Sequence, residues 1–135
     1  MQSALRALEM NPAKLAMLFR KQFAMCNVTE GETMMCISDL TTRREYIEAT
    51  FAAAEEFGVD AYEMCVNNIP VFTKVGVPTI GRCKGTLEAA KAADIIVIFH
   101  VPLFTSWLKE VRAAGTRVLM VIDAPDDLER LMCPP

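Results

Sequence analysis

Four short apolar runs, separated by segments with helical spacing, constrain the fold of this chain more than any other feature of its sequence. The runs occupy residues 32–38, 59–66, 95–99 and 116–122. A nearly continuous apolar run is typical of a strand that is buried on both faces of a sheet. The sequence therefore predicts parallel strands, each connected to the next by a segment that crosses over one face of the sheet.

The segments between the runs carry signals for the starts and ends of helices. Thr42 and Glu45 form the pattern of a capping box, in which Thr42 accepts a hydrogen bond from a helix amide and Glu45 reaches back to the cap. Gly58 follows that helix as a left-handed stop, and residues 67–83 are expected to form an irregular connection. Helices are predicted over residues 12–26, 42–57, 86–93, 103–114 and 126–132.

These elements predict an α/β fold, a Rossmann-like or flavodoxin-like open parallel sheet of about four strands with helices on both faces. A chain of 135 residues suits one domain, and its 53% hydrophobic residues exclude disorder. The last predicted helix has barely begun when the sequence reaches Cys133-Pro134-Pro135, which is typical of the entry to a linker. We therefore expect residues 1–135 to be a single α/β domain, the amino-terminal domain of a longer two-domain protein.

Charge and cysteine content narrow the class of protein. The net charge is −3 and no basic tract is present, so neither nucleic acid nor a membrane is expected as a partner. Five widely spaced cysteines do not resemble a disulfide framework, and a single His argues against a metal site within this chain. Cys26, Cys36 and Cys65 lie in apolar stretches and are interpreted as small core residues. We expect a reduced, cytoplasmic protein.

Polar residues follow each predicted strand, at the edge where open parallel sheets bind ligands. Among them, His100 is predicted to act as a base or hydrogen-bond donor. The predicted ligand-binding residues are Asp39, Asn67, Asn68 and Asp123. Structural roles fit several of the same residues: Asp39 as a helix cap, His100 bonded to a neighbouring backbone group, and Asp123 as a loop-closing residue. Arg44 is interpreted as part of a solvated helix start.

Several segments together are similar to a known family. They are residues 27–32, 67–70, 91–97, 114–119 and 124–132. In order and character they resemble the amino-terminal domain of 2,5-dihydroxypyridine 5,6-dioxygenase and its relatives, which include M29-type proteins labelled leucyl aminopeptidase (aminopeptidase T-like). The resemblance covers nearly the whole chain.

The resemblance implies a domain that caps a metal-dependent active site used in the catabolism of aromatic compounds. In that family Fe(II) or another divalent metal is held by Glu, His and Asp residues of a carboxy-terminal domain, so no cofactor is expected in this chain itself. The missing carboxy-terminal catalytic domain or subunit is then its expected partner. The alternative is a non-catalytic α/β module that binds a small ligand or serves in assembly.

One departure from the family concerns a functional His expected after the third strand. Aligned without gaps, Phe104 stands at that position, with Thr105 and Ser106 beside it and His100 four residues earlier. The resemblance therefore implies His100, Thr105 and Ser106 as cleft residues, and the departure favours a different substrate. A missing partner also predicts an exposed apolar patch around Phe104 and Trp107, and hence a homo-oligomer.

Overall fold

Four parallel strands form one sheet with the order β2-β1-β3-β4. They are β1 (Thr33–Ser38), β2 (Asp60–Cys65), β3 (Ile95–Ile98) and β4 (Arg117–Met120). This computed structural model describes residues 11–67, 79–99 and 106–121. The chain runs from β1 outward to β2 and returns to the other side of β1 for β3, so the strand order reverses between β1 and β3. This order matches the first four strands of a flavodoxin-like sheet.

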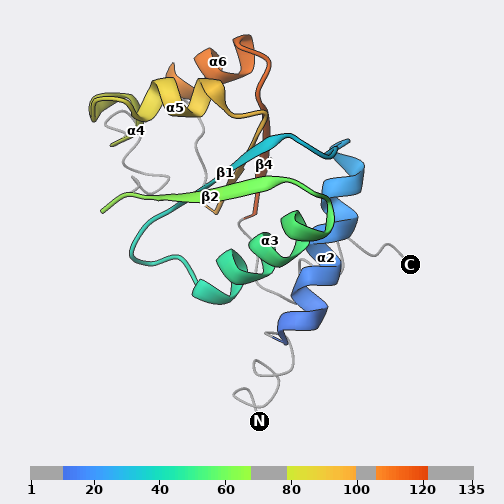
Figure 1. The fold of residues 1–135 in the computed structure, drawn as a ribbon. Coiled ribbons are helices and arrows are strands. Elements are labelled where there is room, and N and C mark those ends of the chain that lie inside the picture. The colour runs from blue at the N-terminus through green and yellow to red at the C-terminus, as the bar shows by residue number, and fades with distance from the viewer. Residues whose placement is uncertain (1–10, 68–78, 100–105, 122–135) are drawn as a thin grey trace.

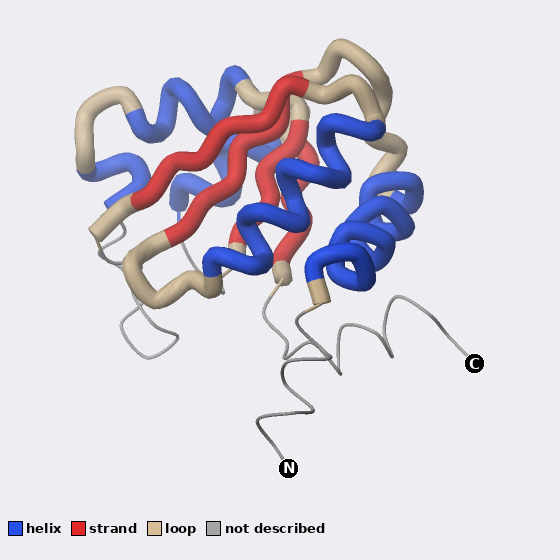
Figure 2. Tube along the Cα trace, turned by 60° about the horizontal axis from the view of Figure 1, so that its bottom comes forward, coloured by secondary structure: helices blue, strands red, loops and turns tan. Residues whose placement is uncertain are grey.

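Helices cover both faces of the sheet (Figures 1 and 2). Helices α2 (Pro12–Met25) and α3 (Arg44–Glu56) lie on one face, and α5 (Thr86–Ala92) and α6 (Ser106–Ala113) lie on the other. A four-residue helical segment, α4 (Thr79–Arg82), precedes α5. The predicted α/β fold with helices on both faces is confirmed.

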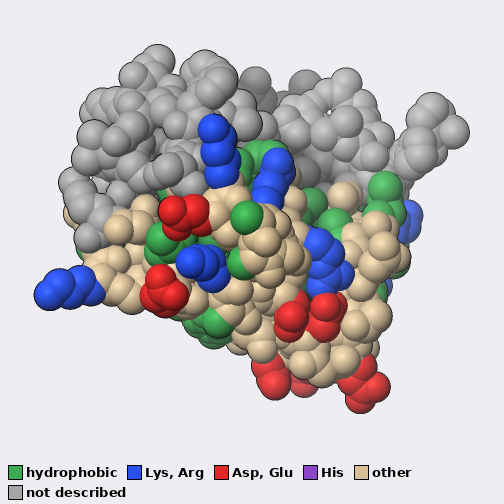
Figure 3. Space-filling model, turned by 90° about the horizontal axis from the view of Figure 1, so that it is seen from above, with side chains coloured by type: hydrophobic (Ala, Val, Ile, Leu, Met, Phe, Trp, Pro, Cys, Tyr) green, Lys and Arg blue, Asp and Glu red, His purple; other side chains and the backbone are tan. Residues whose placement is uncertain are grey.

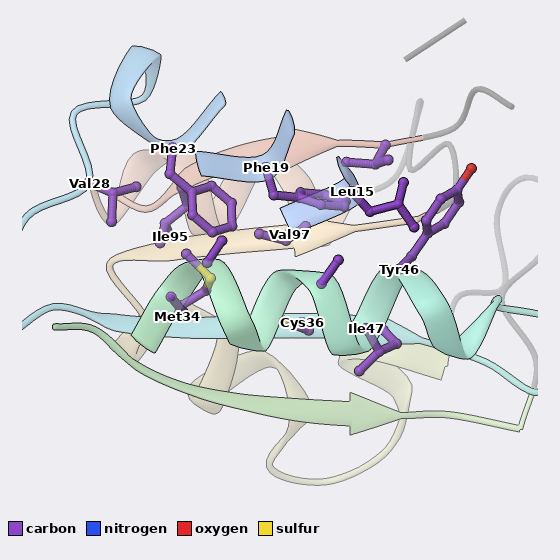
Figure 4. Packing of buried hydrophobic residues seen from close by; sticks show 14 of the residues in the cluster. Leu15, Phe19, Phe23, Val28, Met34, Cys36, Tyr46, Ile47, Ile95 and Val97 are labelled. Carbon is purple, nitrogen blue, oxygen red and sulfur yellow. The ribbon is translucent and has the colours of Figure 1, made fainter. Parts of the chain in front are cut away.

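The larger hydrophobic cluster lies between the sheet and the pair α2 and α3. Figure 4 shows Phe19 and Phe23 of α2 and Ile47 of α3 meeting side chains of β1 and β3. The ring of Tyr46 stacks on that of Phe99, with centroids 5.9 Å apart. Phe19 packs edge-on against both of those rings, an arrangement that aromatic quadrupoles favour.

A second cluster fills the opposite face, beneath α5 and α6. Ile96 and Ile98 of β3 pack there with Val111 and Trp107 of α6. The sequence allowed two interpretations of Trp107, packing within the domain or contact with a missing partner domain. Trp107 is only 3% exposed, so it belongs to this core and does not form part of an exposed apolar patch. On the outer side of these helices, seen in Figure 3, acidic and basic side chains lie interspersed.

Arg117 ties the amino end of the sheet to the end of α2. Its guanidinium donates hydrogen bonds to the carbonyl oxygens of Cys26 and Asn27 at 2.7 and 2.8 Å, and it pairs with the Glu32 carboxylate. The carbonyl oxygens at the end of a helix lack partners within the helix. The Arg117 side chain supplies those partners from β4.

Burial differs between the central and the outer strands. Every residue of β3 and all but the first of β1 are buried, whereas β2 and β4 are partly exposed along their length. Cys36 lies in the core as predicted, but Cys65 is exposed because it lies on the outer strand β2, and Cys26 is half-buried. The prediction that Cys65 is a core residue was wrong.

Four local predictions have different outcomes. The capping box does not form: α3 begins at Arg44, and the Thr42 hydroxyl accepts instead from the backbone N–H of Asp39, at 3.0 Å. The predicted irregular connection contains α4, where Gly81 takes a φ of +94°. Gly58 ends α3 with a φ of +71°, as predicted. The predicted helix over residues 126–132 lies outside the described residues.

The packing of Phe19 predicts a large loss of stability on truncation. Phe19 is fully buried, so Phe19→Ala is expected to lower the free energy of unfolding by about 3–5 kcal/mol, as for other buried aromatic residues. Met17, on the same helix but 37% exposed, is the matched control, and Met17→Ala should cost under about 1 kcal/mol. Denaturant unfolding measures both. Equal losses for the two variants would contradict the placement of α2.

Candidate functional site

The candidate site lies at the carboxyl end of the sheet, where the strand order reverses. Parallel sheets bind ligands beyond the carboxyl ends of strands at such a reversal. Ser38 ends β1 there with 0% exposure, and Asp39 follows it with 7% exposure. Buried polar residues at this position are the strongest indication of a site within the described residues.

A tight turn carries the chain from β1 into α3. The Oδ1 atom of Asp39 accepts hydrogen bonds from the backbone N–H and the hydroxyl of Thr41, at 2.8 and 2.6 Å. The Thr42 N–H donates to the carbonyl oxygen of Asp39 at 3.1 Å, which closes the turn. We call residues Asp39 to Thr42 the strand-end turn. Its hydrogen bonds fix the backbone at the reversal point.

The strand-end turn holds one apolar side chain outward. Leu40 is 81% exposed, more than any other large hydrophobic residue among those that the structure describes. Because the turn is closed by its own hydrogen bonds, Leu40 is not needed to fold it. The side chain is therefore presented at the same edge of the sheet as Ser38 and Asp39.

A second group of side chains joins three elements beside the turn. The Ser38 hydroxyl donates to Oε2 of Glu63 on β2, and the Arg44 guanidinium on α3 donates to the same carboxylate oxygen at 2.7 Å. The Glu63 side chain is 16% exposed and that of Arg44 is 59% exposed. This Arg44–Glu63–Ser38 chain runs from the surface to the fully buried end of β1.

The ionisation of this group follows from its contacts. The hydrogen bond from Arg44 holds the pKa of the Glu63 carboxyl below its ordinary value of 4.5, with a smaller contribution from the Ser38 hydroxyl and an opposing one from burial. Burial, together with the nearby Glu63 charge, raises the pKa of the Cys36 thiol to about 12. At neutral pH the site thus holds a carboxylate and a neutral thiol, and Cys36 is not a nucleophile there.

The structure places only some of the residues predicted from sequence. Asp39 lies at the reversal point, where its carboxylate has the structural role in the turn, and Asn67 is exposed just beyond β2. Ser106 begins α6. The other predicted site residues lie outside the described residues: Asn68, His100, Thr105 and Asp123.

None of the three residues of the group was among the predicted site residues. Arg44 was interpreted as part of a solvated helix start, yet its guanidinium pairs with Glu63. Glu63 is a charged residue inside an otherwise mostly apolar strand segment, which was the available signal. The contact of Glu63 with Ser38 depends on the strand register, which sets Glu63 opposite Cys36, two residues before Ser38. The sequence does not contain that register.

Comparison with known proteins places the chain in a family. Residues 14–135 match the model of the family described as 2,5-dihydroxypyridine 5,6-dioxygenase. The chain belongs to this family. No curated protein matches the sequence.

The fold is also similar to a solved structure of a dioxygenase. The structure of 2,5-dihydroxypyridine dioxygenase from Pseudomonas putida KT2440 aligns with a TM-score of 0.77 at 21% sequence identity. The alignment covers 90% of this chain but only 38% of that one, so this chain spans well under half of the similar protein. At this identity the likeness establishes the fold.

The described residues of this family member do not fit a metal site. Among residues 11–67, 79–99 and 106–121, no group of three or more His, Cys, Asp or Glu side chains is placed to hold a metal ion. Glu63 has Arg44 and Ser38 as partners, and Glu32 has Arg117. In the same part of the chain, no helix is long and apolar enough to cross a membrane.

The two paired carboxylates predict a loss of stability in acid. Hydrogen bonds from Arg44 and Arg117 lower the pKa values of Glu63 and Glu32 in the folded chain, so the stability from both pairs is present above pH 4.5 and is lost as the pH falls through the lower folded values. The free energy of unfolding should therefore decrease on acidification below about pH 4.5.

Denaturant unfolding across this pH range measures the effect. Glu63→Gln and Glu32→Gln should each reduce the fall in unfolding free energy between pH 4.5 and lower pH. Glu55→Gln, at an exposed position on α3, should show the same fall as the parent protein. If neither substitution changes the fall in unfolding free energy below pH 4.5, the two ion pairs are contradicted.

Proposed function

We propose that this chain is the amino-terminal domain of a metal-dependent, dioxygenase-like enzyme and that it walls the active-site cleft. The observation that carries the proposal is the family match over residues 14–135. This chain covers 38% of the similar dioxygenase. In an enzyme of that length, the remaining and larger part of the protein would supply the ligands of the catalytic metal. In this proposal the ligands of Fe(II) or another divalent metal belong to a carboxy-terminal domain or subunit.

The carboxyl end of the sheet is the part of the domain that we assign to the cleft. The strand-end turn supports this assignment, because it is closed by its own hydrogen bonds and presents Leu40 to its surroundings at 81% exposure. An apolar side chain in that position suits contact with a planar ring or with an adjoining domain. Asp39, through its position in the turn, fixes where that contact occurs.

Further polar groups of the cleft are proposed from the sequence. His100, which follows β3, and Thr105 and Ser106, near the start of α6, would contribute proton-transfer or hydrogen-bonding groups. The predicted ligand-binding residues that complete the set are Asn67, Asn68 and Asp123. Phe104 in place of a His favours an aromatic substrate other than 2,5-dihydroxypyridine.

The setting of the enzyme is part of the same proposal. We infer a cytoplasmic enzyme that acts in the breakdown of aromatic compounds, with neither nucleic acid nor membrane as a partner. The homo-oligomer stays a prediction, because Trp107, the described residue of the expected apolar patch, is buried. The family match supports the catabolic role, and the free thiols of Cys26, Cys36, Cys65 and Cys83 are compatible with a reducing compartment.

An anaerobic titration with Fe(II) tests the location of the metal ligands. The 135-residue chain should bind no stoichiometric Fe(II), because no three His, Cys, Asp or Glu side chains of its described residues are grouped as metal ligands, and the Glu63 and Glu32 carboxylates are paired with Arg side chains. Calorimetry gives the stoichiometry, and the full-length enzyme serves as the control that should bind one metal per active site. Tight binding of one Fe(II) per 135-residue chain would contradict the proposal.

A further inference from the structure

The Arg44–Glu63–Ser38 chain has no part in the function proposed above, yet it ends beside the strand-end turn. Glu63 belongs to an outer strand, where a carboxylate can point into water, but its side chain is only 16% exposed. It instead accepts hydrogen bonds from the side chains of Ser38 on β1 and Arg44 on α3. The Glu63 carboxylate therefore does more than keep the exposed edge of the sheet polar.

Ser38 is attached to β2 through two of its atoms. Its hydroxyl donates to Glu63, and its carbonyl oxygen accepts from the Val66 N–H at 2.9 Å. The peptide plane that carries this carbonyl also carries the N–H of Asp39, since a peptide unit is planar. That N–H donates to the Thr42 hydroxyl at 3.0 Å. The first hydrogen bond of the strand-end turn therefore belongs to the same peptide unit as the Ser38 carbonyl that Val66 holds.

We propose that Glu63 is a positioning residue, which acts through the Ser38 hydroxyl to set the strand-end turn at the carboxyl end of β1. The inference rests on the proposed function only in that it takes this turn as a wall of the cleft. Arg44 has the supporting role of holding the carboxylate in place. Edge strand β2 therefore sets the position of the strand-end turn through Glu63.

The physical basis is the burial of the Ser38 hydroxyl. Ser38 is 0% exposed, and a buried hydroxyl without an acceptor is costly, so the side chain adopts the orientation that reaches one. A carboxylate is a stronger acceptor than a neutral group, and the Arg44 guanidinium at 2.7 Å keeps it charged and oriented. Loss of Glu63 removes this acceptor and frees Ser38 to reorient.

A purely structural role, in which Glu63 only fastens β2 to α3, predicts a different coupling pattern. If Glu63 acts through Ser38, its removal should have no additional effect on the turn once the Ser38 hydroxyl is absent. If it acts only through Arg44, the effects of removing Glu63 and Ser38 should add. A double-mutant cycle separates the two cases.

The experiment records amide chemical shifts and hydrogen exchange of the isotope-labelled 135-residue chain. The four proteins are the parent, Glu63→Ala, Ser38→Ala and the double variant. Each single variant should displace the Thr41 and Thr42 amide signals and speed exchange of the Thr41 amide by roughly tenfold, the change expected from one net hydrogen bond. The double variant should show the same signal displacements and the same Thr41 exchange rate as Ser38→Ala alone.

Glu32→Ala is the matched control, because Glu32 is likewise a half-buried carboxylate paired with an Arg, but at the opposite end of the sheet. It should leave the Thr41 and Thr42 signals in place. Glu63→Leu keeps a similar side-chain volume without a hydrogen-bond acceptor, and it should displace the same signals in the same direction if Glu63→Ala does not fold. Unmoved turn signals in the Glu63 variants, additive displacements, or equal displacements in Glu32→Ala would overturn the proposal. Since the experiment uses neither metal nor substrate, its failure is distinct from that of the iron titration.

Discussion

Burial of β1 and β3 on both faces is the constraint on which the rest of the structure depends. Every side chain of β3 and all but the first of β1 are buried, so each strand needs a helix layer above and below it. Helices α2 and α3 supply one layer and α5 and α6 the other. The same requirement forces the chain to cross from one face to the other after β2, and that crossing places the strand reversal between β1 and β3.

The site follows from this topology and not from a motif. At the reversal point the backbone of β1 must turn away towards α3, and the Asp39 carboxylate and the threonine hydroxyls supply the hydrogen bonds that make the turn. The nearby ionic group is assembled from β1, β2 and α3. Both features lie at one end of the sheet, while the Arg117 group ties the opposite end to α2. The carboxyl end of the sheet thus holds the candidate site, and the amino end holds a structural contact.

The sequence predicted the fold better than it predicted the side-chain contacts at the carboxyl end of the sheet. Apolar runs identify buried strands such as β3 because burial is a property of a segment. Cys65 was misplaced because position at the edge of the sheet depends on strand order, which periodicity does not contain. The pairing of Arg44 with Glu63 joins residues 19 apart across two elements, and it depends on strand register in the same way. The capping box failed because α3 begins one residue later than the pattern predicts, with Arg43 and not Thr42 at the N-cap.

The central claim is that the carboxyl end of the sheet faces the reaction cleft of a dioxygenase-like enzyme. Chemical-shift mapping with 2,5-dihydroxypyridine, used as a probe for aromatic substrates, tests it most directly on the isotope-labelled chain. The account predicts shifts concentrated in the amides of residues 38–42 and in Val66 and Asn67, at the ends of β1 and β2. Shifts concentrated at the opposite end of the sheet, around Glu32 and Arg117, would contradict it.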